Sequence, residues 1–230
     1  MINQKVANQK GINQKMRKSM KAAKRLAAIV LAAAVLAVMP AGGPAVSEVR
    51  ADEALPGYVR SVYTNEWIPA EQSVLRPIAV MMPTDKVAQP SYGISSADVL
   101  YEIMEEGEIS RQMAVISNWT GLAKIGNVRS CRAYYLPEAT EWDPILVHFG
   151  GVFYMKDRIT APDINNISGT NQYGVGGGAP GSSAFFRTSD KKAPHNAYTS
   201  ASGVINACAE LGYSLNIRQG LYNVKHFTFA

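Results

Sequence analysis

The chain has 230 residues, of which 47% are hydrophobic, and its formal net charge is +5 at pH 7. Residues 1–51 hold nine of the 23 basic residues and one of the 18 acidic residues, so the remainder has 14 basic and 17 acidic residues and is mildly acidic. The basicity therefore belongs to the N-terminal segment, and it does not indicate a protein that binds nucleic acid.

The N-terminal segment has the layout of a secretory signal. Its first 25 residues carry eight Lys and Arg residues and no acidic residue, an apolar run follows over residues 26–39, and Pro and Gly residues end that run at 40–44. As a helix the run reaches roughly 21 Å, less than a hydrocarbon core of roughly 30 Å. We therefore predict a signal peptide over 1–51. An uncleaved anchor is the alternative. Both place the rest of the chain outside the cytoplasm, with membrane contact only through the N-terminal segment.

A domain is expected to begin shortly after this signal. Residues 52–75 have no clear periodicity and are predicted to be a tether. Five consecutive apolar residues at 78–82 then predict a buried strand, which opens a domain over 76–230.

The next pattern predicts a β-hairpin. Apolar residues alternate over 98–104 and again over 109–116, with Gly107 in the polar turn between them. A turn centred on Glu106-Gly107 would place Glu102 opposite Arg111. Such a pair is either a structural salt bridge, worth about 0.2–1 kcal/mol, or the wall of a polar site. We favour the structural pair.

Four further elements follow, which are a strand over 124–131, a short helix over 133–142, a buried strand over 144–149 and a helix that begins near Ser200 and ends at Gly212. The Gly-, Asn- and Ser-rich stretch 160–183 is expected to be a long mobile loop, and it lacks the Lys-Ser/Thr of a phosphate-binding P-loop. These elements predict a mixed α/β (α+β) domain with a hairpin-containing mixed sheet, packed helices and a long Gly-rich loop.

Five phrases in this order carry a family resemblance: RPIAVM at 76–81, GISSADVLYE at 93–102, EGEISR at 106–111, KIGNVRSCR at 124–132 and APHNAYTS at 193–200. They resemble the YerB-like family of bacterial extracytoplasmic proteins, many of which are named as lipoproteins. The resemblance implies a location in the cell envelope and a further C-terminal domain beyond 76–230, but no chemistry. No cysteine follows the apolar run closely, so lipid attachment is not expected.

Cationic residues at predicted strand ends suggest an anion site. Arginine forks match phosphates and carboxylates, and sites are commonly built from strand ends and the loops after them. The candidates are Arg129, Arg132 and His148 after the strands, with Arg187, His195 and Asn196 before the last helix.

Each candidate also has a structural explanation. Arg129 and Arg132 could pair with Glu138 or Glu141 on the following helix. His148 beside an aromatic residue is more often a satisfied core histidine than a ligand. His195 and Asn196 could hold a turn before the helix.

The two cysteines, Cys131 and Cys208, could form a disulfide or be small buried residues, and Cys131 between two arginines could be a reactive thiol. No spacing of His or Cys predicts a metal site, and no cofactor is expected. We therefore predict a non-catalytic envelope domain that binds an anionic cell-wall or lipid-linked ligand, or an envelope protein. The alternative is an enzyme that processes a phosphoanion with Arg129, Arg132, Arg187 and His195.

Overall fold

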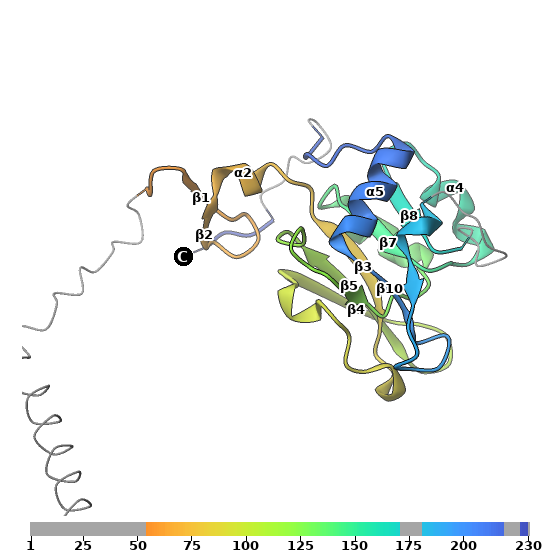
Figure 1. Ribbon diagram of the computed structural model, residues 1–230. Coiled ribbons are helices and arrows are strands. Elements are labelled where there is room, and N and C mark those ends of the chain that lie inside the picture. Colours follow the sequence, from red (N-terminus) through yellow and green to blue (C-terminus); the bar gives the residue numbers. More distant parts are fainter. Residues whose placement is uncertain (1–53, 171–180, 219–225, 230) are drawn as a thin grey trace, which may run out of the picture. The chain divides into compact units, whose positions relative to one another are not determined.

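The computed structural model describes residues 54–170, 181–218 and 226–229 (Figure 1). The predicted signal over 1–51 and most of the Gly-rich stretch lie outside the described residues. Within the described ranges, no helix is both long enough and apolar enough to cross a bilayer.

A five-stranded mixed sheet forms the centre of the described domain. Its strands lie in the order β4-β5-β3-β7-β8. β3 is parallel to β7, and β7 to β8, whereas β5 is antiparallel to both β3 and β4. The bounds are β3 Ile78–Pro83, β4 Val99–Met104, β5 Ser110–Ile116, β7 Ile145–His148 and β8 Asn165–Ser168.

Both faces of this sheet are covered, which explains the continuous apolar runs of β3 and β7. On one face the core includes Ile78, Val80 and Val147 and is closed by helix α5, Ala201–Leu211, which crosses the sheet in Figure 1. On the other face the core is closed by α3, Leu136–Thr140, and α4, Lys156–Ile159. The predicted fold class, a mixed sheet with packed helices, is confirmed.

The predicted hairpin is present, but its register was wrong by one residue. Glu102 lies opposite Gln112, and Arg111 lies opposite Ile103. The turn between the strands is longer than expected, because β4 ends at Met104 and β5 begins at Ser110. Two of its residues are left-handed, Gly107 at φ 82° and Glu108 at φ 61°. A shift of one residue moves side chains to the other face of the sheet. The predicted pair between Glu102 and Arg111 therefore does not form.

The strand predicted over 124–131 is shorter than expected and does not join the main sheet. Only β6, Ile125–Gly126, is a strand, and it pairs with β10, Ala197–Thr199. β10 also pairs with β9, Phe186–Arg187, which completes a small three-stranded sheet. This sheet joins the residues after 124 to the loop that carries His195.

Two segments expected to be irregular contain ordered elements. Part of the predicted tether forms a small hairpin of β1, Tyr58–Arg60, and β2, Trp67–Pro69, followed by α2, Ala70–Ser73. The predicted loop over 160–183 contains β8, which the sequence hides because its buried side chains include the polar Asn166 and Ser168.

A buried arginine joins the amino ends of the parallel strands. Arg76 is fully buried, and its guanidinium forms an ion pair with Asp143 at 3.2 Å and donates to Asn165 Oδ1 at 2.7 Å. It also donates to the main-chain oxygens of Asp143, Pro144 and Ser214. Burial lowers the pKa of Arg76 to about 10, so the group remains charged at neutral pH. Nothing in the sequence pattern predicted this role for Arg76.

The two cysteines are free and buried in different layers of the domain. Cys208 lies on the buried face of α5, and Cys131 packs in the core under α3. Of the two alternatives left open by the sequence, a disulfide or two small buried residues, the structure has the second. Burial raises the pKa of the Cys131 thiol to about 12, which is the opposite of what a reactive thiol needs.

Candidate functional site

The main chain of Arg129 lies at the carboxyl ends of the parallel strands. Its N–H donates to Met81 O at 2.8 Å, near the end of β3, and its carbonyl accepts from Phe149 N at 2.9 Å, directly after β7. Loops at the carboxyl ends of parallel strands are where ligands bind in open α/β sheets. The structure thus places one predicted residue where this fold most often builds a site.

The Arg129 side chain has no directly paired acid in the described part of the chain, and Asp85 and Glu105 act on it only from beyond ion-pair distance. It makes no ion pair there, and its Nη1 is buried without a hydrogen-bond partner. Burial lowers the pKa of Arg129, and the neighbouring Arg111 guanidinium lowers it further. An anion would compensate this cation, so Arg129 is the central residue of the candidate site.

Arg111 is part of the same cluster, a role that the sequence did not assign to it. Only 1% of its surface is exposed. One guanidinium nitrogen donates to Ser130 O at 3.0 Å, beside Arg129, and another forms a close ion pair with Glu105. The Nε of Arg111 is buried without a partner. The real partner of Arg111 is thus Glu105, and Glu102 instead accepts hydrogen bonds from Ser110 and Gln112.

Arg132 lies at the edge of the cluster and is engaged by acidic residues of the hairpin turn. Its guanidinium pairs with Glu106 at 2.8 Å and with Glu105 at 3.5 Å. The partners suggested from the sequence, Glu138 and Glu141, form no ion pair with it. Arg132 therefore contributes less free positive charge than Arg129.

The loop after β9 brings His195 to this cluster. Asn127, which is fully buried, donates from Nδ2 to His195 O at 2.7 Å and to Ala88 O at 2.9 Å. His195 Nδ1 is buried without a partner. Burial lowers the pKa of His195, and the positive charge of Arg129 lowers it further. The structure therefore brings Arg129 and His195 together, as a shared anion site requires.

Arg187 and Asn196 form a separate pair near the cluster. Arg187 Nη1 donates to Asn196 Oδ1 at 2.7 Å, and its guanidinium lies 4.7 Å from the centre of the Phe149 ring. Phe149 is hydrogen-bonded to Arg129 through the main chain. Arg187 is therefore an exposed neighbour of the site, and Asn196 holds its guanidinium in place.

His148 is a structural residue and does not belong to the site. It is fully buried, and its ring nitrogens contact Gly150 O at 2.7 Å and Asn166 Oδ1 at 3.1 Å. Its assignment to the anion site is corrected, and the alternative of a satisfied core histidine is confirmed.

Because His148 is buried, we expect the free energy of unfolding to depend on pH. Burial lowers the pKa of His148, so below about pH 6.5 the unfolded chain binds a proton that the folded chain resists. We expect the free energy of unfolding to fall as the pH drops from about 7.5 to about 5.5, by up to about 1.4 kcal/mol per pH unit for this proton. Urea unfolding at several pH values measures this slope.

The matched control is His148→Gln, which should have a flatter slope whatever its absolute stability. His195→Gln tests the second histidine, because a lowered pKa there acts in the same direction. An unchanged slope in His148→Gln would show that other groups cause the acid sensitivity.

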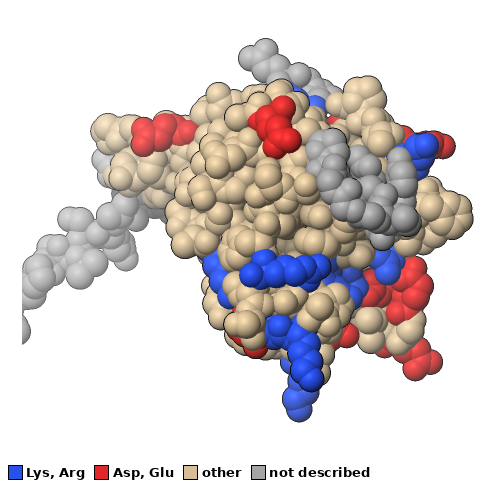
Figure 2. Space-filling model, turned by 45° about the vertical axis from the view of Figure 1, so that its right-hand side comes forward, with Lys and Arg blue, Asp and Glu red and all other residues tan. Residues whose placement is uncertain are grey.

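One face of the domain carries many Lys and Arg side chains. Figure 2 is turned so that the right-hand side of Figure 1 comes forward, and it shows Lys and Arg side chains gathered on the lower part of that face. Lys191 donates to Ala88 O and to Pro90 O, the latter at 2.7 Å, and so ties the His195 loop to the loop after β3.

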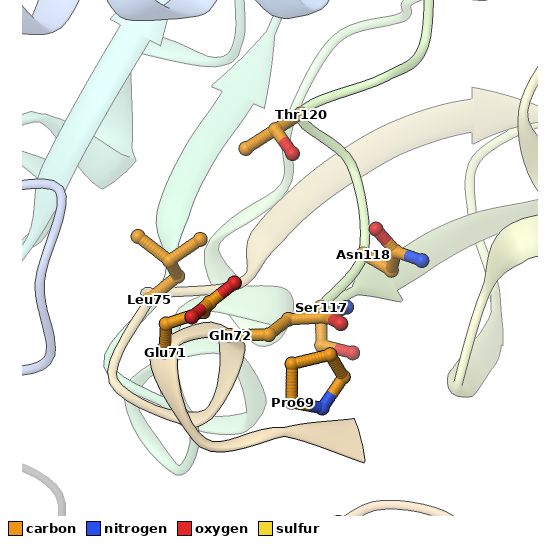
Figure 3. Close-up of a pocket in the computed structure, with 7 residues that line it drawn as sticks. All are labelled: Pro69, Glu71, Gln72, Leu75, Ser117, Asn118 and Thr120. Atoms are coloured by element: carbon orange, nitrogen blue, oxygen red, sulfur yellow. The ribbon is translucent and has the colours of Figure 1, made fainter. Parts of the chain in front are cut away.

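A second candidate is the pocket in Figure 3, which has a volume of about 240 Å³. Its lining residues come from the end of β2, from α2 and the residues after it, and from the loop after β5: Pro69, Glu71, Gln72, Leu75, Ser117, Asn118 and Thr120. The lining contains one carboxylate and no basic side chain, so it does not fit an anion. Elsewhere in the described ranges, no group of three or more His, Cys, Asp or Glu residues could hold a metal ion.

A comparison with known protein families identifies the family of this chain. It belongs to the family described as "Protein of unknown function (DUF3048) N-terminal domain", whose family model matches residues 63–214. Together with the relative and the solved structure described next, this match confirms the resemblance to YerB-like proteins. The match begins inside the predicted tether, in line with the hairpin found there.

One curated relative is YerB of Bacillus subtilis. The chain is 31% identical over 140 residues to "Putative lipoprotein YerB" of strain 168, a match that covers 61% of this chain and 40% of that protein. The crystal structure of YerB from Bacillus subtilis matches with a TM-score of 0.60 and 27% identity, over 69% of this chain and 51% of that one. The chain thus spans about half or less of this relative's length.

Proposed function

We propose that this domain is an exported, non-catalytic binding module of the cell envelope, which holds an anionic ligand at Arg129. The observation that carries the proposal is the partly buried Arg129 guanidinium, which forms no ion pair among the described residues and interacts electrostatically with Arg111 and His195. A desolvated cation beside other cations is unfavourable, and a bound anion would relieve this.

Two further observations support a location outside the cytoplasm. The cationic, apolar and helix-breaking order of residues 1–51 is typical of an export signal. The relative YerB is named as a lipoprotein, a class of protein that is held at the outer surface of a membrane. The proposed ligands are the anionic polymers and lipids of that surface.

A sedimentation assay tests the proposal. Cell-wall sacculi that retain their phosphate-containing polymers, or vesicles of phosphatidylglycerol, are mixed with the protein and pelleted. We expect Arg129→Gln to bind at least about tenfold more weakly, since a hydrogen-bonded charged group contributes about 1.5–3 kcal/mol. Binding of the unaltered protein should also weaken with added salt.

The matched control is Arg158→Gln. Arg158 forms an ordinary surface pair with Asp163 at 2.8 Å, outside the cluster, and its loss should leave binding unchanged. Equal sedimentation of the Arg129→Gln variant and the unaltered protein would refute the proposed site.

A further inference from the structure

Two neighbouring aromatic side chains project from the loop after β7. Phe153 is 78% exposed, the largest exposed fraction of any large hydrophobic residue in the described ranges, and Tyr154 is 58% exposed. Their rings lie 5.6 Å apart in an edge-to-face arrangement, so the two residues form one aromatic projection. Single exposed apolar residues are ordinary on protein surfaces, whereas contiguous ones mark interaction sites.

The base of the aromatic projection is fixed in the core. Its two residues begin the 3₁₀ helix η4, Phe153–Met155, and α4 follows directly, at the right of Figure 1. Met155 and Ile159 are fully buried, and Val152 packs against the same core. The fold therefore presents both rings to solvent on a firm support.

The aromatic projection follows a segment that is bonded to the Arg129 segment. Phe149 N donates to Arg129 O at 2.9 Å, and Cys131 N donates to Gly150 O at 3.0 Å. The Arg187 guanidinium lies 4.7 Å from the centre of the Phe149 ring. The residues that lead to the two rings thus run beside the arginines of the candidate site.

The charge on this side of the projection is on balance positive. The cations around Arg129 outnumber the acids there, which are Asp85, Glu105 and Glu106 against Arg111, Arg129, Arg132, Arg187 and Lys191. On the other side, Lys156 and Arg158 are balanced by Asp157 and Asp163. A membrane surface that contains anionic lipids attracts net positive charge.

The size of the projection favours a lipid surface over a protein partner. An aromatic side chain buries about 150–250 Å² when it is fully enclosed, so the exposed parts of the two rings amount to roughly 200–350 Å². A stable protein interface needs about 800 Å² from each partner. A bilayer needs no complementary surface, and aromatic side chains with a polar tip, such as Tyr, gather at its interface with water.

We propose that Phe153 and Tyr154 insert into the interfacial region of a phospholipid bilayer, at the outer surface of the cell membrane. The export signal predicted over 1–51 would bring the domain to that surface, and the relative YerB is named as a lipoprotein. The inference goes beyond the proposed function, because it concerns other residues and a lipid surface instead of an anion at Arg129.

Single-site labelling of the full chain in vesicles tests the inference. Phe153→Cys is labelled with an environment-sensitive fluorophore, which spares the native thiols because Cys131 and Cys208 are buried. The chain is reconstituted into phosphatidylglycerol vesicles with and without a spin-labelled lipid, which quenches the probe on contact. We expect a blue shift of the probe emission in vesicles and a loss of its intensity when the spin-labelled lipid is present.

Matched controls assign this effect to the aromatic projection. Ile205→Cys carries the same probe on the exposed side of α5, which covers the opposite face of the sheet from Met155, and its emission should lose little intensity. Tyr154→Ser, added to the protein labelled at 153, should reduce the quenching because it removes the second ring. Tyr58→Ser, which replaces an exposed tyrosine of β1, should leave the quenching unchanged.

Two results would overturn the inference. One is an equal loss of intensity for the probes at 153 and 205. The other is a blue shift that grows with the protein-to-lipid ratio and is insensitive to the spin-labelled lipid, which would indicate a second copy of the chain as the partner. Sedimentation with sacculi is a separate measurement, because it depends on Arg129 and not on the rings. If Arg129→Gln loses sacculus binding in either case, the proposed function remains and only the membrane contact fails.

Discussion

Replacing Arg76 with methionine should lower the free energy of unfolding by about 3–5 kcal/mol. The side chain is fully buried and donates five hydrogen bonds, which join the residues before β7 and the first residue of β8 to Ser214, after α5. Methionine fills most of the volume but leaves Asn165 Oδ1 and the main-chain oxygens of Asp143, Pro144 and Ser214 without this donor, and it removes the ion pair with Asp143. Urea unfolding monitored by tryptophan fluorescence measures the loss.

The matched control is Arg158→Met, the same substitution in a surface pair. Both members of that pair, Arg158 and Asp163, have side chains that are 41% exposed, so its loss should cost about 1 kcal/mol or less. Asp143 also pairs with Arg218, which keeps its carboxylate compensated in Arg76→Met. Equal losses in the two variants would show that Arg76 does not hold the strands together.

Replacing Trp119 with alanine should cost about 3–5 kcal/mol. Trp119 is fully buried in the core under α5, and its indole N–H donates to Arg76 O at 2.9 Å. The variant therefore creates a cavity in the larger core and also removes a hydrogen bond to the buried arginine segment. Chemical unfolding followed by circular dichroism suits this variant, because it loses a fluorescent reporter.

Two further variants separate these effects. Trp119→Phe keeps much of the ring but removes the indole N–H, and should cost about 1 kcal/mol from the hydrogen bond alone. Trp67→Ala removes a partly exposed indole on the β1-β2 hairpin, which stacks against Arg60 at 4.2 Å, and should cost clearly less than Trp119→Ala. If Trp67→Ala cost as much as Trp119→Ala, the central role of Trp119 in the core would be wrong.

The strongest elements of the fold could be predicted from the sequence because local chemistry determines them. The apolar runs of β3 and β7 indicated strands covered on both faces. Ser200 accepts from Gly203 N at the start of α5, and Gly212 ends the helix at φ 68°, as the capping signals predicted. The register of the hairpin was missed because it depends on backbone angles in the turn, where Glu108 adopts a conformation that its residue type rarely takes.

The candidate site was only partly predictable for a different reason. Arg129 and His195 were found because cations at strand ends are visible in a sequence. Arg111 was found as a charge but given the wrong partner, because a single-residue shift of register decided between Glu102 and Glu105. His148 is next to the same strand end, yet its side chain points into the packed interior, and no pattern in the sequence reports that direction.

The main-chain position of Arg129 gives the site a built-in reporter. Its N–H is bonded to Met81 and its carbonyl to the N–H of Phe149, so the residue that would hold the ligand also bridges β3 and the end of β7. A ligand that immobilises the guanidinium would restrict local opening of this bridge. Amide hydrogen exchange at Arg129 and Phe149 would therefore slow with occupancy, and the two protons would record binding even when no spectroscopic change occurs in the ligand.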